Sequence, residues 1–161
     1  MKLQRSHGHE NVMGLGPRVW GGYHERIMNE KDNIQRFLAG ERFAVVGAST
    51  DRRKYGNKVL RVYMQNDRAV YPVNPKADEV EGLTCYADLK SLPEPVHGIS
   101  IITPPAVTQR VVDEAVQLGI EHIWMQPGAE SAEAVDQAEQ AGANVIAGGP
   151  CALVVMGYRE G

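Results

Sequence analysis

The sequence predicts an α/β fold, with a single doubly wound and mainly parallel sheet of five to six strands and helices on both faces. Three observations predict it. After residue 40, short runs rich in β-branched residues alternate with segments of helical periodicity. The connections between these segments are short, and glycines follow three of the expected helices. Such alternation requires right-handed crossovers, which bring the carboxyl ends of parallel strands to one edge of the sheet.

The elements are expected in the following order. A first β–α–β unit comprises a strand at Phe43–Val46, a helix from about Asn57 to Asn66 and a strand at Ala69–Val73. The later strands are expected near 83–86 and at 97–102, 120–125 and 144–147, and the later helices at 105–118 and 131–141. Pro105 suits the first turn of its helix, and Gly119 and Gly142 suit the helix ends.

The first 40 residues differ from the rest of the chain. Residues 1–22 contain five glycines and no apolar periodicity, so we expect an arm that is loose or packed on a partner. Apolar residues between 23 and 39 recur at helical spacing, and Gly40 then ends the expected helix. We therefore divide the chain into an arm with a leading helix at 1–40 and an α/β domain at 41–161.

Composition restricts the classes of function. The chain has 161 residues, of which 43% are apolar, enough for one core. A formal charge of −3 disfavours nucleic-acid binding, and no apolar run is long enough to suggest a membrane span or a signal peptide. The two cysteines, Cys85 and Cys151, are far apart, which is typical of free thiols in a reducing compartment. We expect a cytoplasmic protein.

The first strand exit, from Gly47 to Gly56, has the composition of a phosphate-binding loop. Gly47 permits a close backbone approach, and the helix beyond Gly56 offers unpaired N–H groups with a partial positive charge. Arg52, Arg53 and Lys54 add three cations close to the helix start. The alternative interpretation is a solvated turn in which glycine serves only to change the direction of the chain.

Four further strand exits carry candidate ligand groups, each of which also suits an ordinary turn. They are Asn74-Pro75-Lys76, Thr103-Pro104-Pro105, Gln126-Pro127-Gly128 and, last, Cys151. Asn74 offers an amide to a base or a ribose, while the prolines stiffen the groove wall. Cys151 is either a buried, inert residue or a reactive thiol, and the sequence leaves both open. Parallel topology would bring all of these loops to one crevice.

Other chemistries lack support in the sequence. A dinucleotide fold of the nicotinamide class requires three spaced glycines after the first strand and an acidic residue after the second, and this chain has neither. No strand precedes the Gly14-Leu15-Gly16 stretch, so it is not such a motif. His7 and His9 are too few for a metal site, and no catalytic Ser-His-acid pattern occurs. We predict no metal site and no catalytic residue.

The ordered series of motifs carries a resemblance. AVVGAST at 44–50 with Tyr55-Gly56 is followed by YPVNP at 71–75, ITPP at 102–105, WMQPGA at 124–129 and GGPC at 148–151. This series resembles the small stand-alone CoA-binding proteins, whose Rossmann-like domain is similar to the N-terminal domain of the succinyl-CoA synthetase α-subunit. The resemblance covers about residues 42–155.

The resemblance implies a role for each strand exit. Gly47, Ala48, Ser49, Thr50, Lys54, Tyr55 and Gly56 would contact the phosphates and the nucleotide end of CoA, and Arg52 is a further candidate contact. Asn74, Pro75 and Lys76 would flank the adenosine, and Thr103, Pro104 and Pro105 would line the groove. Gln126, Pro127, Gly128 and Cys151 would lie towards the pantetheine. These residues form the predicted cofactor site.

The resemblance does not imply the synthetase reaction, because fold alone does not specify function. In the synthetase a phosphorylated histidine comes from a second domain, for which we expect no room before Gly161. We therefore predict a module that binds CoA or an acyl-CoA without ligase activity of its own. The alternatives are an NAD(P)-binding oxidoreductase or thiol redox sensor that uses Cys151, and a regulatory subunit of a synthetase-like complex. A homo-oligomer or a synthetase-like partner is compatible with each.

Overall fold

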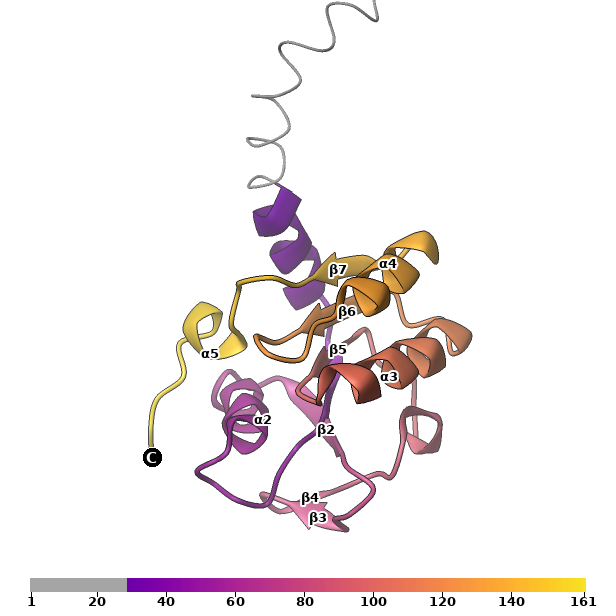
Figure 1. Ribbon diagram of the computed structural model, residues 1–161. Coiled ribbons are helices and arrows are strands. Elements are labelled where there is room, and N and C mark those ends of the chain that lie inside the picture. The colour runs from indigo at the N-terminus through magenta and orange to yellow at the C-terminus, as the bar shows by residue number, and fades with distance from the viewer. Residues whose placement is uncertain (1–28) are drawn as a thin grey trace, which may run out of the picture. The chain divides into compact units, whose positions relative to one another are not determined.

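The computed structural model describes residues 29–161, of which 36–161 form one compact unit (Figure 1). Residues 29–38 are helical, in the second half of the expected leading helix. The expected arm at 1–22, with its two histidines and its Gly-Leu-Gly stretch, lies outside the described residues, as do residues 23–28. No helix within 29–161 has the length and apolar character that crossing a membrane requires.

The sheet has five parallel strands, which confirms the predicted fold class. The strands are β1 (Arg42–Val46), β2 (Ala69–Val73), β5 (Gly98–Ile101), β6 (His122–Met125) and β7 (Asn144–Ile146), in the order β2-β1-β5-β6-β7. The strand expected near 83–86 is not a strand of this sheet, although Tyr86 makes an isolated parallel bridge to Val73 at the sheet edge. Instead β4 (Leu83–Thr84) pairs antiparallel with β3 (Glu79–Val80) as a small separate hairpin.

Helices cover both faces of the sheet. They are α2 (Tyr55–Gln65), α3 (Pro105–Gln117), α4 (Ala132–Gln140) and α5 (Ala152–Val155), with a 3₁₀ turn, η1 (Leu89–Ser91), before β5. α2 and α5 pack together on one side, and α3 and α4 pack together on the other, as Figure 1 shows. The helices thus form the outer two layers of an α/β sandwich.

Successive side chains of each strand point to opposite faces of the sheet, so each strand contributes to the core on both faces. In β1, Ala44 and Val46 belong to a buried cluster with residues of α3 and α4. Phe43 points the other way and packs against Phe37 and Tyr63, with ring centroids 5.2 Å away in each case. Successive side chains of a strand point to opposite faces, so a strand buried on both sides must be apolar throughout. The near-continuous apolar run Phe43–Val46 reflects this arrangement.

The strand order places a crevice beside β1. From β1 the chain crosses to β2 on one side and later returns past β1 to β5 on the other. The loops that leave β1 and β5 therefore diverge, and such switch points hold the ligands of open parallel sheets. This topology determines where a binding site can form.

Candidate ligand-binding site

A cavity of about 790 Å³ occupies this crevice. It is lined by loops after β1, β2 and β5, by the residues around η1 and by one face of α3. The predicted site residues in its lining are Gly47, Ser49, Lys54, Tyr55, Gly56, Asn74, Pro75, Lys76, Thr103 and Pro104. Ala48, Thr50, Arg52, Pro105, Gln126, Pro127, Gly128 and Cys151 do not line it. Three of the five predicted exits thus meet at one cavity.

Two glycines allow the loop after β1 to fold tightly. Gly47 has a φ of +99°, and a Cβ on it would lie 2.1 Å from the Ile102 carbonyl oxygen. A Cβ on Gly56, in the first turn of α2, would lie 2.1 Å from the Gly47 carbonyl oxygen. Any side chain at either position would push apart the backbones that form the floor of the cavity.

Two helices that begin at the cavity lack side-chain caps. Neither Lys54, at the start of α2, nor Pro104, at the start of α3, caps its helix, and neither first turn contains an acidic residue. By contrast, Ser131 caps α4 through its side chain, and Glu133 lies in the first turn of that helix. The first N–H groups of α2 and α3 therefore remain suited to an anionic ligand.

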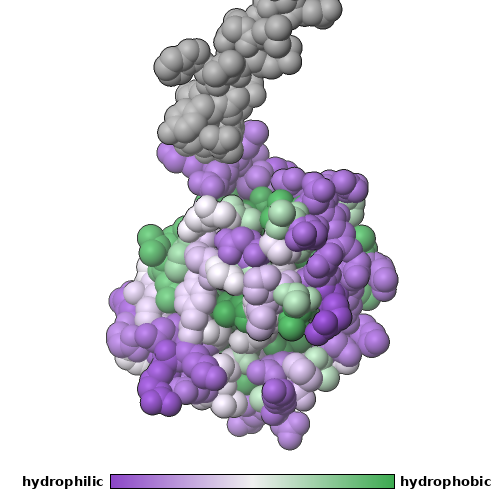
Figure 2. Space-filling view, viewed as in Figure 1, coloured by the Kyte–Doolittle hydropathy of each residue, from purple (hydrophilic) through white to green (hydrophobic). Residues whose placement is uncertain are grey.

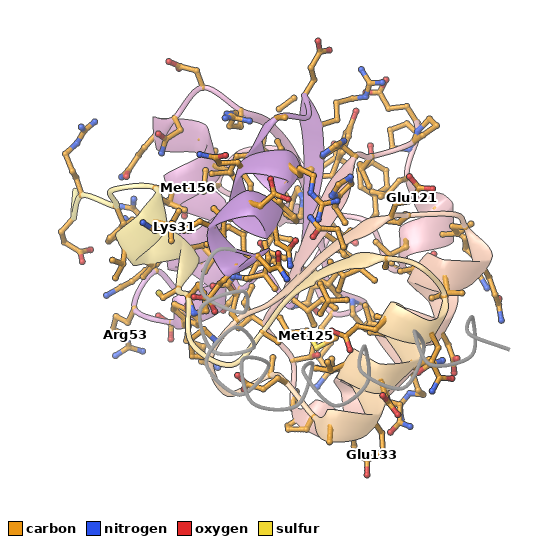
Figure 3. All side chains as sticks on the ribbon, turned by 90° about the horizontal axis from the view of Figure 1, so that it is seen from above. Lys31, Arg53, Glu121, Met125, Glu133 and Met156 are labelled. Carbon is orange, nitrogen blue, oxygen red and sulfur yellow. The ribbon has the colours of Figure 1, made fainter. Side chains whose placement is uncertain are left out.

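Of the loop cations, Lys54 lines the cavity, and Arg52 and Arg53 are paired elsewhere. Arg52 Nε lies 3.3 Å from Glu81, and Arg53 makes a two-point contact with Asp51 at 3.0 Å. The hydrogen bond from Arg53 lowers the pKa of Asp51 to about 2. Figure 3 shows Arg53 extending outward, and its side chain is 89% exposed. The loop therefore presents one cation to the cavity.

Two other cations join Lys54. Lys76 follows β2, and Arg110 extends from α3. None of the three forms a salt bridge with another described residue. Hydrophilic residues also gather outside the cavity, over the β1–α2 loop and the C-terminal segment, at the lower left of Figure 2. The lining also includes the carboxylates of Asp88 and Glu114, so three basic and two acidic side chains leave a formal excess of one positive charge at the cavity, against the negative net charge of the chain.

The side chain of Asn74 is occupied by the protein. Its Nδ2 donates to the Ala48 carbonyl oxygen at 2.6 Å, and its Oδ1 accepts from the Lys76 backbone N–H at 2.9 Å. Asn74 therefore ties the exits of β1 and β2 together. Asn74 was predicted to present its amide to a base or ribose, and in the structure this amide instead shapes the cavity edge.

Gln126 and Cys151 meet behind Tyr55. Gln126 is fully buried, and its Oε1 accepts from the Tyr55 hydroxyl at 2.9 Å and from the Ala152 N–H at 2.8 Å. Burial raises the pKa of Tyr55, so its hydroxyl remains protonated at neutral pH. Because Tyr55 donates to Gln126, the Cys151 thiol donates to the Tyr55 oxygen, at 2.9 Å. Tyr55 thus separates the cavity from the final strand exit.

Gly128 and Cys85 also have their polar groups close to other groups of the protein. The Gly128 N–H donates to the Glu130 carboxylate at 2.7 Å, so this backbone group is already bonded. Burial raises the pKa of the Cys85 thiol, which is buried and lies beside the Asn74 carbonyl. Within residues 29–161, no three His, Cys, Asp or Glu side chains are grouped as a metal site requires.

One wall of the cavity, which α3 contributes, was not predicted from the sequence. Val107, Arg110, Val111 and Glu114 line the cavity, as do residues 87–89. The helical spacing of positions 107, 110, 111 and 114 places them on one face, and this periodicity was the available signal. These residues lie along a helix and not at a strand end, so the positions of the strand ends did not indicate them.

Comparison with known proteins identifies relatives of this domain. A family model described as a CoA binding domain matches residues 41–157. ADP-forming acetate–CoA ligase I of Archaeoglobus fulgidus is 29% identical over 123 residues, which are 70% of this chain and 18% of the ligase. The chain thus corresponds to less than a fifth of that enzyme.

Smaller relatives match over most of their own length. The solved structure of a conserved hypothetical protein from Pyrococcus furiosus is 42% identical, with a TM-score of 0.68, and the match covers 71% of this chain and 98% of that chain. The uncharacterized protein YneT of Bacillus subtilis is 26% identical over 116 residues, which are 72% of this chain and 84% of YneT. The predicted resemblance is confirmed, and the chain belongs to the CoA-binding domain family.

Proposed function

We propose that the chain binds CoA or an acyl-CoA in the crevice beside β1, and that it has no ligase activity of its own. The observation that carries the proposal is the cavity lining, which combines two uncapped helix N-termini with Lys54, Lys76 and Arg110. CoA carries a diphosphate and a further phosphate on the ribose. Several anionic groups on one ligand match several unpaired cations and N–H groups in one cavity.

The apolar part of the lining supports the same ligand class. Val46, Val73, Leu89, Ile102 and Val107 form a wall beside the cations. Ligand cavities typically combine such a wall with a few convergent polar groups, and a flat base such as adenine needs both. The match of the family to residues 41–157 supports the division of the chain at residue 40, which we propose as the start of the binding domain.

The distribution of histidines supports binding without ligase chemistry. Within residues 29–161 the histidines are His97 and His122, whose rings stack with centroids 4.1 Å apart. Both lie where β5 and β6 begin, at the edge of the sheet opposite the cavity. Neither can reach a ligand at the strand exits, so no described histidine is placed to accept a phosphoryl group beside a CoA bound there.

Isothermal titration calorimetry with CoA, dephospho-CoA and NAD tests the proposal. We expect CoA to bind in the micromolar range and dephospho-CoA to bind more weakly, because it lacks one phosphate. NAD should bind most weakly, since β2 ends at Val73, is followed by Asn74 and has no acidic residue at its end to bond the ribose. Absence of binding by both CoA species would refute the proposal, and tighter binding of NAD would favour the oxidoreductase alternative.

The relation to acetate–CoA ligases favours one further proposal, association with a synthetase-like partner. The matching segment makes up 18% of the Archaeoglobus ligase, so most of that enzyme lies outside the match. A chain that provides the CoA-binding part could act with a separate protein that provides the remainder. Purification of the tagged chain from its native host, followed by mass spectrometry, tests this association. Recovery of the chain alone at physiological salt would count against it.

A further inference from the structure

The hairpin after β2 contains an unusual backbone conformation. β3 and β4 are joined by Glu81 and Gly82, which have φ values of +51° and +79°. Two-residue hairpin loops with both residues in the left-handed region favour Asn, Asp or Gly at the first position, because a longer side chain is strained there. Besides Glu81, Asp67 is the only non-glycine residue in 29–161 with a positive φ. Strain at a position where glycine would fit calls for a compensating role.

The contacts of the Glu81 carboxylate compensate for the strained backbone of this residue. Its Oε2 accepts a hydrogen bond from Asn57 Nδ2 at 3.0 Å and lies 3.3 Å from Arg52 Nε. The side chain of Glu81 is only 19% exposed, and Asn57 is fully buried. The hairpin thus places a carboxylate against the first turn of α2 and beside the loop that precedes it.

Asn57 transmits this contact to the loop. Its Nδ2 also donates to the Ser49 carbonyl oxygen at 2.8 Å, and its Oδ1 accepts from Arg61 Nε at 2.7 Å. Arg61 in turn donates to the Arg52 carbonyl oxygen at 2.8 Å. Both ends of the Asn57 amide are therefore bonded, and its orientation is fixed because Glu81 and the Ser49 carbonyl each require a donor while Arg61 requires an acceptor. Two carbonyl groups of the β1–α2 loop are held by this chain of bonds.

We propose that Glu81 is a positioning residue for the ligand loop, and that its strained backbone is retained because its carboxylate orders residues 48–54. This inference rests on the proposed function for its effect on affinity. Ser49 and Lys54 line the cavity, so a loop ordered before binding spares the ligand the entropic cost of ordering it. Glu81 itself does not line the cavity, and it acts through Asn57 and Arg52.

The decisive variant is Glu81→Gly, because glycine relieves the backbone strain while removing the carboxylate. We expect its melting temperature to remain close to that of the wild type, whereas the dissociation constant for CoA should rise about five- to tenfold. Amide exchange measured by NMR in the free protein should accelerate at Asp51, Arg53 and Lys54, whose N–H groups are bonded within the loop. The control is Asp67→Gly, which relieves similar backbone strain far from the cavity. It should change neither the dissociation constant for CoA nor the amide exchange of the loop.

A conservative variant separates positioning from general packing. Glu81→Gln retains an oxygen acceptor for Asn57 and loses only the charge, so it should recover most of the affinity and of the exchange protection. Glu79→Gln makes the same charge change in the same hairpin and should behave as the wild type. If Glu81→Gly does not fold, Glu81→Asn replaces it, since Asn tolerates the left-handed region but is too short to make the same contacts.

CoA affinity and amide exchange in the loop together show whether the role of Glu81 or the proposed function fails. Normal loop exchange and normal CoA affinity in Glu81→Gly would overturn the inference. If the wild type binds no CoA, the proposed function fails, and loop exchange in the free protein alone decides the role of Glu81. A Glu81→Gln variant as defective as Glu81→Gly would also overturn the proposed route through Asn57, because this variant keeps the hydrogen-bond acceptor.

Discussion

At the scale of single residues, the nearest charged partner decides which cations can serve a ligand. Arg52, Arg53 and Lys54 are adjacent in sequence, yet the first two have carboxylate partners and Lys54 has none in the described part of the chain. The pairing of Arg53 with Asp51, two residues away, follows from local sequence. The pairing of Arg52 with Glu81 depends on the hairpin, so no pattern within the loop could indicate it.

The first prediction follows from this difference. Lys54→Gln should raise the dissociation constant for CoA about three- to tenfold, as expected for one partly solvated charge contact, and should weaken the dependence of affinity on salt. Calorimetry at two or more salt concentrations measures both effects. Arg53→Gln is the matched control, because it removes the same charge one residue earlier and should leave affinity nearly unchanged. Equal losses in the two variants would contradict the assignment.

A second prediction concerns the pH dependence of stability. Burial, and after it the neighbouring His97 ring, lowers the pKa of His122. Arg36 bonds the Asn144 Oδ1, so the Asn144 Nδ2 faces His122 Nδ1 at 3.0 Å, and this ring nitrogen must accept. Because the folded pKa lies below the unfolded value of about 6.5, the stabilisation is complete above that pH and is lost as the pH falls below it.

Urea denaturation at pH 7 and pH 5 measures this effect. The wild type should lose stability between the two, and His122→Gln should lose less, because glutamine can still accept from Asn144 but does not titrate. A variant that loses as much stability as the wild type would show that other groups dominate the acid response.

At the scale of elements, the contact between β1, its loop and α2 depends on the absence of a side chain. Gly56→Ala would place a Cβ 2.1 Å from the Gly47 carbonyl oxygen, and the chain must shift to relieve the overlap. We expect a loss of about 1 to 3 kcal/mol in the free energy of unfolding, measured by chemical denaturation, and a loss of CoA affinity.

Gly149→Ala is the control for this variant. A Cβ at Gly149 has no neighbour within 4 Å, and this glycine does not have a positive φ. Its free energy of unfolding should therefore remain within about 0.5 kcal/mol of the wild-type value. A stable Gly56→Ala protein with normal affinity would show that the loop can separate from the helix without affecting the site.

The strands and helices that were predicted correctly are those in which apolar residues recur with a clear strand or helix period. Ala69–Val73 is a strand with the predicted bounds, and α2, α3 and α4 each begin and end within two residues of the expected positions. The hairpin of β3 and β4 and the helix α5 were not predicted as such. α5 has only four residues, and the Ala152 N–H in its first turn is bonded by the buried Gln126 side chain. Tertiary contacts, which local patterns do not contain, support such short elements.

At the scale of the whole molecule, the sheet edge that holds the crevice could be predicted, whereas the position of the crevice beside β1 depends on a strand order that was not predicted. Alternating strands and helices require that the strand exits share an edge. The depth of the cavity and its α3 wall could not be predicted, because they depend on how α3 lies over that edge. The same packing leaves Gln126 and Cys151 behind Tyr55, although they follow strands as the cavity residues do.

The last prediction uses this asymmetry between the two halves of the crevice. The cations without a salt bridge and the first turns of α2 and α3 lie around the exits of β1, β2 and β5. At the exits of β6 and β7 the polar groups are bonded within the protein, and the first N–H of α5 donates to Gln126. Adenosine 3′,5′-bisphosphate should therefore retain most of the binding free energy of CoA, within about tenfold in affinity, and pantetheine alone should bind weakly.

Calorimetry with the two fragments and with CoA measures this division of binding energy. Tyr55→Phe serves as the matched variant, because it keeps the ring at the cavity but removes the hydroxyl that bonds Gln126 and Cys151. This change should leave the affinity for the nucleotide fragment nearly unaltered and should alter the affinity for whole CoA more. Tight binding of pantetheine with weak binding of the nucleotide would contradict this division, because the cations and helix N-termini of the cavity would then not supply the main part of the binding energy.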